Sequence, residues 1–399
     1  MMRNDWIEVE LGEVCDGVMG QSPPSSTYNI EGRGLPFFQG KAEFTDLHPV
    51  VQRWCDTPKR TAQPFDILLS VRAPVGSTNI ANTKCAIGRG LAAITYRPEH
   101  KYVWYYLRLI EKKLDEQGTG TTFKAISGGI LKSQRVSLAP LPEQRAIVSK
   151  IEQLFSELDN GIDNLKAAKK KLGTYRQAVL KKAFDGGFTK RTIKWENNTL
   201  RDILRISSGV GLAKANRNDN GNYLVYGGNG VTGRHSEYMF EDRQLIIGRV
   251  GVHCGNVHIT KPKSWVTDNA FVVSFDEAKI RFDCLYYLIL SLRLNQYASS
   301  TAQPVISGGR VYPVEFLLPP KEIQESLVQE IETRLSVYDN VLTNIERGLE
   351  KAESLRQSIL KNAFEGKLLS EEELAACRLE PDWEPADKLL ERIKKQRNE

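Results

Sequence analysis

The sequence contains the same long segment twice, 180 residues apart, and this duplication constrains the fold more than any other feature. Aligned at that offset, Gln144 falls on Gln324, and the match runs without a gap to the segment ends, QAVLKKAFDGG and QSILKNAFEGK. The same register extends upstream to an ISGG tetrapeptide, at 126–129 and at 306–309. Further identical pairs are Val148 and Val328, Ile151 and Ile331, Arg176 and Arg356, Leu180 and Leu360, and Phe184 and Phe364. Because internal repeats have to be recognised before a fold is assigned, we interpret the chain as a tandem duplication.

Both copies are predicted to form long helices, over about 144–186 and 322–364. Apolar residues recur at steps of three and four, which is typical of a helix with one buried stripe. Each copy follows a proline-containing stretch and ends near Gly186 or Gly366, in agreement with helix start and stop signals. About 42 helical residues at about 1.5 Å each correspond to roughly 63 Å. A helix of that length is suited to a spacer.

The apolar positions of each helix form two heptad seams. Two such helices in one chain can bury each other as an antiparallel coiled coil. Gly161, Arg334 and Gly348 fall on one of the seams and are poor residues for it, so we expect imperfect packing there.

Composition bounds the class of protein. A chain of 399 residues is expected to hold two or three domains, and 41% hydrophobic residues are ample for their cores. The net charge of +6 is compatible with a nucleic-acid partner, but it is also ordinary. The six cysteines form no CxxC pair, so we expect reduced thiols. There is no apolar leader and no run of about 18 apolar residues, so we expect a cytoplasmic protein.

A globular domain of similar design precedes each helix. Trp6 lies five residues before Leu11, as Trp195 lies five before Leu200. Short β-like runs separated by Gly, Pro, Ser and Asn predict mixed sheets with loops. The runs are 6–11, 35–38, 67–71, 92–96, 223–226, 245–247 and 270–274, with amphipathic helices expected at 102–114 and 284–294. We therefore predict an α/β (α+β) chain of two similar domains, 1–140 and 190–320, with helical regions at 141–189 and 321–369.

Two further segments leave alternatives open. The half-helix 166–182 has seven cationic and no acidic residues, which fits a solvated face or a surface against DNA phosphates or an acidic partner. The tail, 370–399, has a short amphipathic helix after Pro385. Its apolar residues Leu389, Leu390 and Ile393 are expected to dock on the chain's own domain or on a partner.

The duplication suggests how such a chain would be used. Duplex DNA has local two-fold symmetry, and a reader with one domain on each half-site needs them about 34 Å apart or a multiple. Divergent loops on a shared scaffold are what two different half-sites would need, because specificity resides in side chains at base edges.

Three sets of motifs carry a family resemblance: the ISGG…LAPLPEQ and ISGG…LLPPKEIQ lead-ins, the helix ends RQAVL (176–180) and RQSIL (356–360), and the tail DWEPA…LLERI (382–393). With them, the chain resembles the specificity subunit of type I restriction–modification systems over nearly its whole length. The resemblance implies two target recognition domains related by pseudo-two-fold symmetry, each reading half of a split DNA site. It also implies helical regions that set the spacing and bind two methyltransferase (M) subunits in a bacterial or archaeal cytoplasm.

The resemblance places catalysis elsewhere: S-adenosylmethionine and adenine-N6 methylation with the M subunits, and ATP, Mg²⁺, translocation and cleavage with a restriction (R) subunit. The sequence agrees, because it has no Asn/Asp-Pro-Pro-aromatic motif and no GxxxxGK[ST] loop. Gly209–Gly211 lacks a third glycine, and His253, Cys254 and His258 lack a fourth metal ligand. The alternatives are a methyltransferase or nuclease fusion and a coiled-coil scaffold without a DNA role.

Residues that could touch DNA are polar side chains in loops after strands. Arg suits guanine edges, and Asn or Gln suits adenine. The candidates are Gln39, Lys41, Arg72 and Arg89 in the first domain and Asn229, Arg234, Arg249 and Asn269 in the second. Candidate phosphate contacts are Thr121, Thr122, Thr301 and Ser307. For each, an ordinary surface hydrogen bond or phosphate contact is the alternative. The ISGG glycines are expected to be structural turns.

Overall fold

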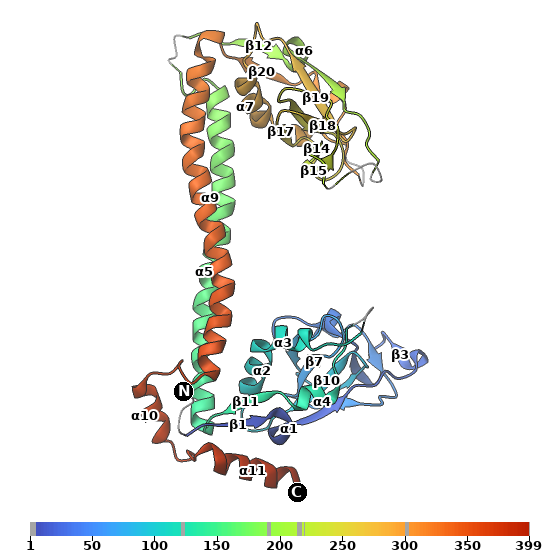
Figure 1. Cartoon of the computed structure of the whole chain (residues 1–399), viewed down its shortest axis with the longest axis vertical. Helices are drawn as coiled ribbons and strands as arrows, with labels where there is room; N and C mark the ends of the chain where they lie inside the picture. The colour runs from blue at the N-terminus through green and yellow to red at the C-terminus, as the bar shows by residue number, and fades with distance from the viewer. Residues whose placement is uncertain are drawn as a thin grey trace. The chain divides into compact units, whose positions relative to one another are not determined.

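The computed structural model of the chain describes residues 5–120, 124–189, 193–213, 218, 220–299 and 303–398. The chain divides into two compact units (Figure 1). The first unit contains Met1–Asp163 and Gly348–Glu399, and the second contains Asn164–Arg347. The first unit is therefore built from both ends of the sequence.

The globular part of the first unit contains three small sheets. Strand β1 pairs with β11, four antiparallel strands have the order β2-β10-β7-β8, and five strands have the order β3-β5-β4-β9-β6 with β4 and β9 parallel. The strands are β1 (Ile7–Glu10), β2 (Asp16–Met19), β3 (Tyr28–Asn29), β4 (Leu35–Phe38), β5 (Trp54–Cys55), β6 (Thr61–Ala62), β7 (Ile67–Ser70), β8 (Thr78–Ile80), β9 (Cys85–Ile87), β10 (Leu91–Thr95) and β11 (Arg135–Leu138). The helices are α1 (Leu11–Val14), α2 (His100–Leu109), α3 (Glu111–Glu116) and α4 (Gly128–Lys132), with 3-10 turns η1 (Ser25–Thr27) and η2 (Lys41–Glu43).

The globular part of the second unit repeats this plan. Strand β12 pairs with β20, four strands have the order β13-β19-β16-β17, and three have the order β15-β14-β18 with β14 and β18 parallel. The strands are β12 (Glu196–Thr199), β13 (Leu204–Ser208), β14 (Tyr223–Gly227), β15 (Gly230–His235), β16 (Leu245–Gly248), β17 (Val257–Ile259), β18 (Ser264–Val266), β19 (Ala270–Phe275) and β20 (Glu315–Leu318). The helices are α6 (Leu200–Ile203), α7 (Phe282–Leu292) and α8 (Gly308–Val311), with η4 (Leu294–Tyr297).

The strands expected from the sequence are confirmed as β1, β4, β7, β10, β14, β16 and β19. One helix prediction is wrong in detail: 102–114 is two helices, α2 and α3, because Ile110 leaves the helical conformation with φ −93° and ψ 8°. Ile110 and Leu114 are both buried in the core, so the apolar spacing continues across the break and conceals it. The helix expected at 284–294 is α7, with Leu294 in the following 3-10 turn.

Each domain is followed by a helix of 44 residues, α5 (Leu141–Phe184) or α9 (Lys321–Phe364). The side chains that meet show that the helices run antiparallel, as expected. In the first unit Asp159 forms an ion pair with Arg356. In the second unit the ammonium of Lys169 lies 2.8 Å from the carboxylate of Glu346, and Arg176 lies over the ring of Tyr338. Residues further along α5 therefore contact residues earlier in α9. Part of the cationic half-helix 166–182 thus faces α9.

The repeated glutamines join each long helix to its own domain. Gln144 is fully buried, accepts a hydrogen bond from the Tyr96 hydroxyl at 2.9 Å and donates to the Ala139 carbonyl at 2.7 Å. Gln324, also fully buried, donates to the Pro319 carbonyl at 2.9 Å and accepts from the backbone N–H of Arg281 at 2.8 Å. A buried amide has to be bonded at both ends, which accounts for glutamine at this position in both copies.

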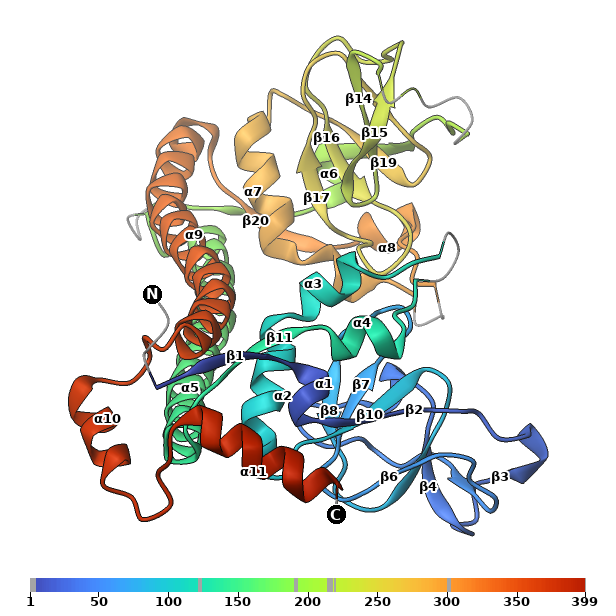
Figure 2. The same cartoon turned by 60° about the horizontal axis from the view of Figure 1, so that its bottom comes forward.

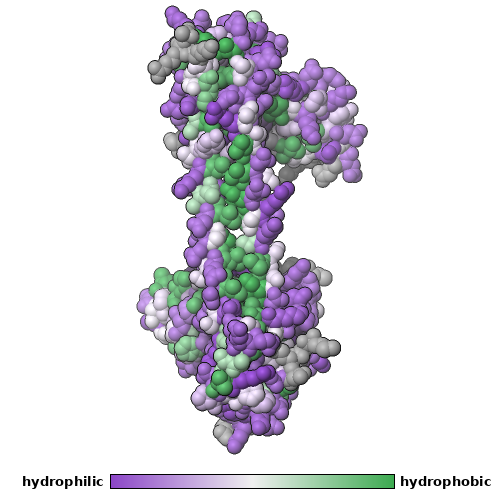
Figure 3. Space-filling view, turned by 90° about the vertical axis from the view of Figure 1, so that its left-hand side faces the viewer, coloured by the Kyte–Doolittle hydropathy of each residue, from purple (hydrophilic) through white to green (hydrophobic). Residues whose placement is uncertain are grey.

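Only one of the two heptad seams is buried along the helix pair. Ile331, Ile345 and Ala352 are buried, whereas most of the other seam is at the surface, with Val341 40% and Leu355 49% exposed. Two helices cover each other along one stripe, so a second apolar seam would need a third element to cover it. Figure 3 shows hydrophobic side chains gathered over α5 and α9 on this face of each unit.

The irregular seam positions follow from this arrangement. Gly161 and Arg334 are exposed and Gly348 is half-buried, so none of them has to pack inside a closed interface. Arg334 instead forms an ion pair with Glu330 and lies 4.4 Å above the ring of Phe188. These three positions lie on an open seam, and not within the closed interface that the sequence led us to expect.

The C-terminal tail packs on the first domain, the first of the two alternatives expected from the sequence. It forms helices α10 (Glu371–Arg378) and α11 (Ala386–Asn398), and both views place α11 beside α1 (Figures 1 and 2). Leu389 and Ile393 are buried in the core of the first unit. Arg397 donates to the carbonyls of Gly12 and Glu13, and the ammonium of Lys394 beside the Glu13 carboxylate lowers its pKa.

All six cysteines are buried and unpaired, as expected for reduced thiols. In the part of the chain that the structure describes, no helix is long and apolar enough to cross a membrane.

Candidate nucleic-acid interface

In the first domain, two strand ends and a turn meet at one edge. The N–H of Gly88 donates to Phe38 at the end of β4 at 2.8 Å, and the N–H of Val71 after β7 donates to Gly90 at 2.9 Å. A Cβ on Gly90 would lie 2.2 Å from the carbonyl oxygen of Gln39. This close backbone approach requires glycine, and it brings three loops that are distant in sequence to a single place.

The side chains of these loops line a hollow of about 270 Å³. The four residues of this domain predicted to contact bases, Gln39, Lys41, Arg72 and Arg89, are among its lining residues, and none of the lining residues is acidic. The three cationic side chains are exposed, and no described carboxylate forms an ion pair with them. We refer to Gln39, Lys41, Arg72 and Arg89 as the first cluster.

The second domain repeats the same backbone arrangement. The N–H of Thr267 donates to the carbonyl of Tyr226, one residue before the end of β14, at 2.8 Å, and the N–H of Arg249 after β16 donates to the carbonyl of Asn269 at 2.9 Å. A Cβ on Gly228 would lie 2.8 Å from the carbonyl oxygen of Asn269. The candidates Asn229, Arg249 and Asn269 are therefore brought to one edge, and we refer to these three residues as the second cluster.

The fourth candidate of the second domain, Arg234, is held away from this edge. It pairs with Leu224 inside the β14–β15 hairpin, and its guanidinium donates to the carbonyl oxygens of Gly221 at 3.0 Å and Asn222 at 3.4 Å. The candidates Thr121, Thr122 and Thr301 lie outside the described residues.

Equivalent backbone positions carry different side chains in the two domains. The bond from Val71 to Gly90 in the first domain is equivalent to the bond from Arg249 to Asn269 in the second. Counting along the chain from these residues, Arg72 corresponds to Val250 and Arg89 corresponds to Asp268. Sequence reasoning missed Val250 and Asp268, because the equivalence becomes visible only through these long-range hydrogen bonds. The two edges therefore present different chemistry on the same framework.

In the second cluster, neighbouring residues fix the polar side chains. Arg249 lies 5.4 Å above the ring of Phe271 and donates to the Ser208 hydroxyl at 3.3 Å. The amide of Asn256 donates to the side-chain oxygen of Asn229 at 3.4 Å. Neither Ser208 nor Asn256 was among the predicted residues, and only their spatial proximity identifies them.

The ISGG repeats hold these edges in place. The N–H of Ile126 donates to the Val71 carbonyl at 3.0 Å, and the N–H of Ile306 donates to the Arg249 carbonyl at 2.9 Å. The hydroxyl of Ser127 then caps helix α4 by accepting from Ile130, while Ser307 is the N-cap residue of α8. The motif is therefore a structural junction at the candidate interface. Its glycines are not turns, as expected from the sequence, but the first residues of helices α4 and α8.

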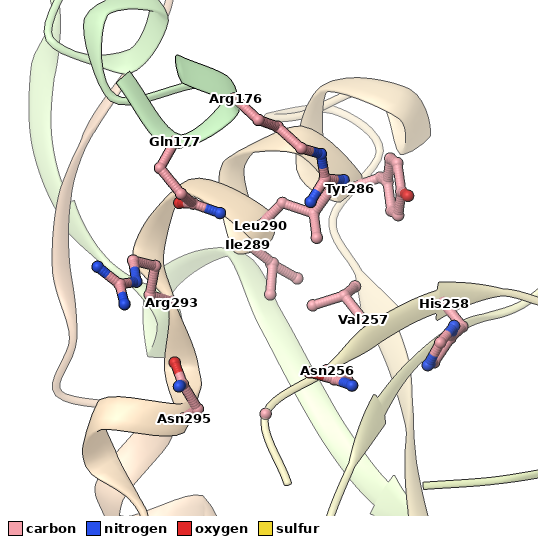
Figure 4. A pocket seen from close by; sticks show the side chains of 11 residues that line it. Arg176, Gln177, Asn256, Val257, His258, Tyr286, Ile289, Leu290, Arg293 and Asn295 are labelled. Atoms are coloured by element: carbon pink, nitrogen blue, oxygen red, sulfur yellow. The ribbon is translucent and has the colours of Figure 1, made fainter. Parts of the chain in front are cut away.

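A second hollow, of about 540 Å³, lies elsewhere in the second unit (Figure 4). Arg176 and Gln177 extend from α5 over Ile289 and Leu290 of α7, and His258 lines the β17 side. Burial lowers the pKa of His258, which favours a neutral imidazole. None of the loop residues predicted to contact DNA lines this hollow. Within the described ranges no group of three or more His, Cys, Asp or Glu could hold a metal ion.

Two similar domains, each carrying a polar loop edge and each followed by a long helix, define a tandem recognition protein. The chain belongs to the type I restriction modification DNA specificity domain family, whose model matches residues 3–167 and 192–353. The family indicated by the sequence motifs is thereby confirmed, and the methyltransferase or nuclease fusion is not favoured.

Similar proteins include two restriction enzyme specificity subunits and one solved structure. The chain is 44% identical over 176 residues to a putative type I restriction enzyme MjaX specificity subunit of Methanocaldococcus jannaschii, an alignment that covers 42% of this chain and 41% of that protein. It is 24% identical over 302 residues to the type I restriction enzyme EcoprrI specificity subunit of Escherichia coli, covering 70% and 73%. Among solved structures, the HsdS subunit from Thermoanaerobacter tengcongensis is 51% identical, with 39% of each chain covered and a TM-score of 0.37.

Proposed function

We propose that this chain is the DNA-reading, non-catalytic subunit of a type I restriction–modification complex, and that each domain reads one half of a bipartite site. The observation that carries the proposal is the pair of equivalent loop edges with different side chains, Arg72 and Arg89 against Val250 and Asp268. To read two unrelated half-sites, the two domains need the same framework but different side chains at the positions that contact bases.

The chemistry of the clusters suggests how bases are distinguished. Arg72 and Arg89 can each pair with the O6 and N7 acceptors of guanine, and the amide of Gln39 can pair with adenine. In the second cluster the amides of Asn229 and Asn269 can pair with adenine, and the guanidinium of Arg249 can pair with guanine. Lys41 suits a phosphate, which positions the protein without reading sequence.

The open seam of the helix pair supports a docking role. Tyr175 is 43% exposed and, together with Val337 and Val341, it leaves an apolar stripe in the second unit without a cover. Exposed apolar patches of this kind mark interaction surfaces. We assign them to two M subunits, which would carry S-adenosylmethionine and methylate adenine N6. An R subunit would bring ATP and Mg²⁺ for translocation and cleavage.

A domain exchange tests the proposal. When residues 10–120 are replaced with the corresponding segment of a relative, we expect methylome sequencing of cells carrying the chain and its methyltransferase partner to show one new half-site and one unchanged half-site. A change in both halves would contradict independent reading. The absence of bipartite binding by the native complex would favour a scaffold without a DNA role.

Removing one cation of the first cluster should act on one half-site only. Arg89→Ala deletes an exposed side chain and should leave folding unchanged. A bidentate arginine–guanine pair discriminates by about 1–3 kcal/mol, so affinity should fall by roughly 5- to 150-fold, with relaxed specificity at one position. Fluorescence anisotropy with single-base variants of the site measures both effects. Lys84→Ala, an exposed cation of the same domain outside the hollow, is the control and should change affinity less than 2-fold, about 0.4 kcal/mol or less.

A further inference from the structure

Two equivalent loops carry an exposed apolar residue beside the clusters. In the second unit, the loop between β16 and β17 begins with Arg249 and carries Val252, which is 84% exposed. In the first unit, the loop between β7 and β8 begins with Val71, the backbone equivalent of Arg249, and carries Pro74, which is also exposed. A single exposed apolar side chain is ordinary, but its recurrence at equivalent places in both halves needs an explanation.

The backbone of both loops is fixed in the same way. The N–H of Gly255 donates to the Gly248 carbonyl at 2.7 Å, as the N–H of Gly76 donates to Ser70 at 2.8 Å. On the other side, the N–H of Gly251 donates to the Pro304 carbonyl at 2.8 Å, and the N–H of Ala73 donates to Lys124 at 3.0 Å. Each loop is therefore tied at its base and to the segment that leads into ISGG.

A buried residue that follows the tip anchors each loop in the domain. Cys254 and Val75 are buried, while Gly255 and Gly76 have φ values of +84° and +95°. A Cβ on Gly255 would lie 2.3 Å from the backbone nitrogen of Asn295, so glycine is required there. The loop is held by Cys254 and the backbone, and Val252 adds almost no buried surface to the fold. Its apolar side chain remains available for a ligand.

We infer that Val252 contacts the C5 methyl group of a thymine in the half-site read by the second domain. This inference rests on the proposed function. In the major groove thymine alone presents a methyl group, and an apolar side chain is its complement. Arg249 and Asn229 supply hydrogen-bonding groups at the same edge, and the nearby loop tip supplies the apolar contact that they lack.

Deoxyuridine substitution tests this contact, because uracil differs from thymine only by that methyl group. The probe is a duplex containing the methylated site, with each thymine of the second half-site replaced in turn, bound to the full chain with its methyltransferase partner. At one position we expect about 4-fold weaker binding by the native protein, equivalent to about 0.8 kcal/mol for one buried methyl group. Val252→Ala should bind the thymine duplex about 4-fold more weakly and should be insensitive to uracil there.

Leu379→Ala is the matched control, since Leu379 is 86% exposed and lies after α10 in the tail. It should keep the native response to uracil. The inference is overturned if Val252→Ala keeps full sensitivity to uracil, or if the second half-site has no thymine on either strand. Equal weakening on every sequence would also overturn it and would indicate a wedge between base steps. Failure of the proposed function is a separate result: the native complex would not discriminate against changes in the second half-site at all.

Discussion

Adding four residues to both long helices is expected to lengthen the spacer of the recognised DNA site by one base pair. The insertions belong between Asp163 and Asn164 and between Lys351 and Ala352, which face each other according to the register of the Asp159–Arg356 ion pair. Four helical residues add about 6 Å and rotate the chain about 40° beyond a full turn. The added length allows one or two base pairs at about 3.4 Å each. The rotation favours one, because one base pair turns the duplex by about 35°.

Methylome sequencing reads the new spacer directly, and the original site should lose its methylation. Replacing four exposed residues at the same places with alanine, without changing the length, is the control and should leave the spacer unchanged. Insertion into α5 alone should displace the buried seam of one helix against the other and reduce stability. If the doubly extended protein still methylates the original site, the helices do not measure the distance between half-sites.

Gln144→Ala is expected to lower the free energy of unfolding by about 2–4 kcal/mol. The substitution removes the acceptor of the Tyr96 hydroxyl and the donor to the Ala139 carbonyl in a fully buried place. Each orphaned buried group costs about 1–3 kcal/mol. Burial already raises the pKa of Tyr96 far above its ordinary value, so the hydroxyl cannot ionise to escape the loss.

Chemical denaturation followed by circular dichroism measures this effect. Gln153→Ala, on the same helix, is the control, because Gln153 is exposed and, among the residues that the structure describes, bonds only to Glu157 one turn away. It should change stability by less than about 0.5 kcal/mol. Equal stability of the two variants would show that Gln144 does not join the helix to the domain.

The duplication and the helices could be predicted because their signals are local. The heptad spacing and the flanking proline and glycine residues placed the start of each helix within three residues of Leu141 and Lys321. The strands could also be predicted, because the alternation of apolar residues and the Gly, Pro and Asn residues that bound a strand lie within a few positions of each other. The break at Ile110 was missed, since its apolar spacing is the same in one helix or two.

Assembly of the candidate interface depends on pairings between distant strands, which no local pattern encodes. The first cluster was named from residue types after strands, yet its closure depends on the parallel pairing of β4 with β9 and on Gly90 against Gln39. The same reasoning named Arg234, which the β14–β15 hairpin register holds against Gly221. It also overlooked Val252, because a valine in a loop has no sequence signal of function.

The discontinuous first unit has a consequence for the order of folding during synthesis. Its core includes Trp6 near the start of the chain and Phe364, Leu389 and Ile393 near the end. The second unit, Asn164–Arg347, is contiguous and can close while the chain is still being made. The domain that leaves the ribosome first therefore completes its core last. Until then, its apolar surface is exposed to solvent and available to chaperones.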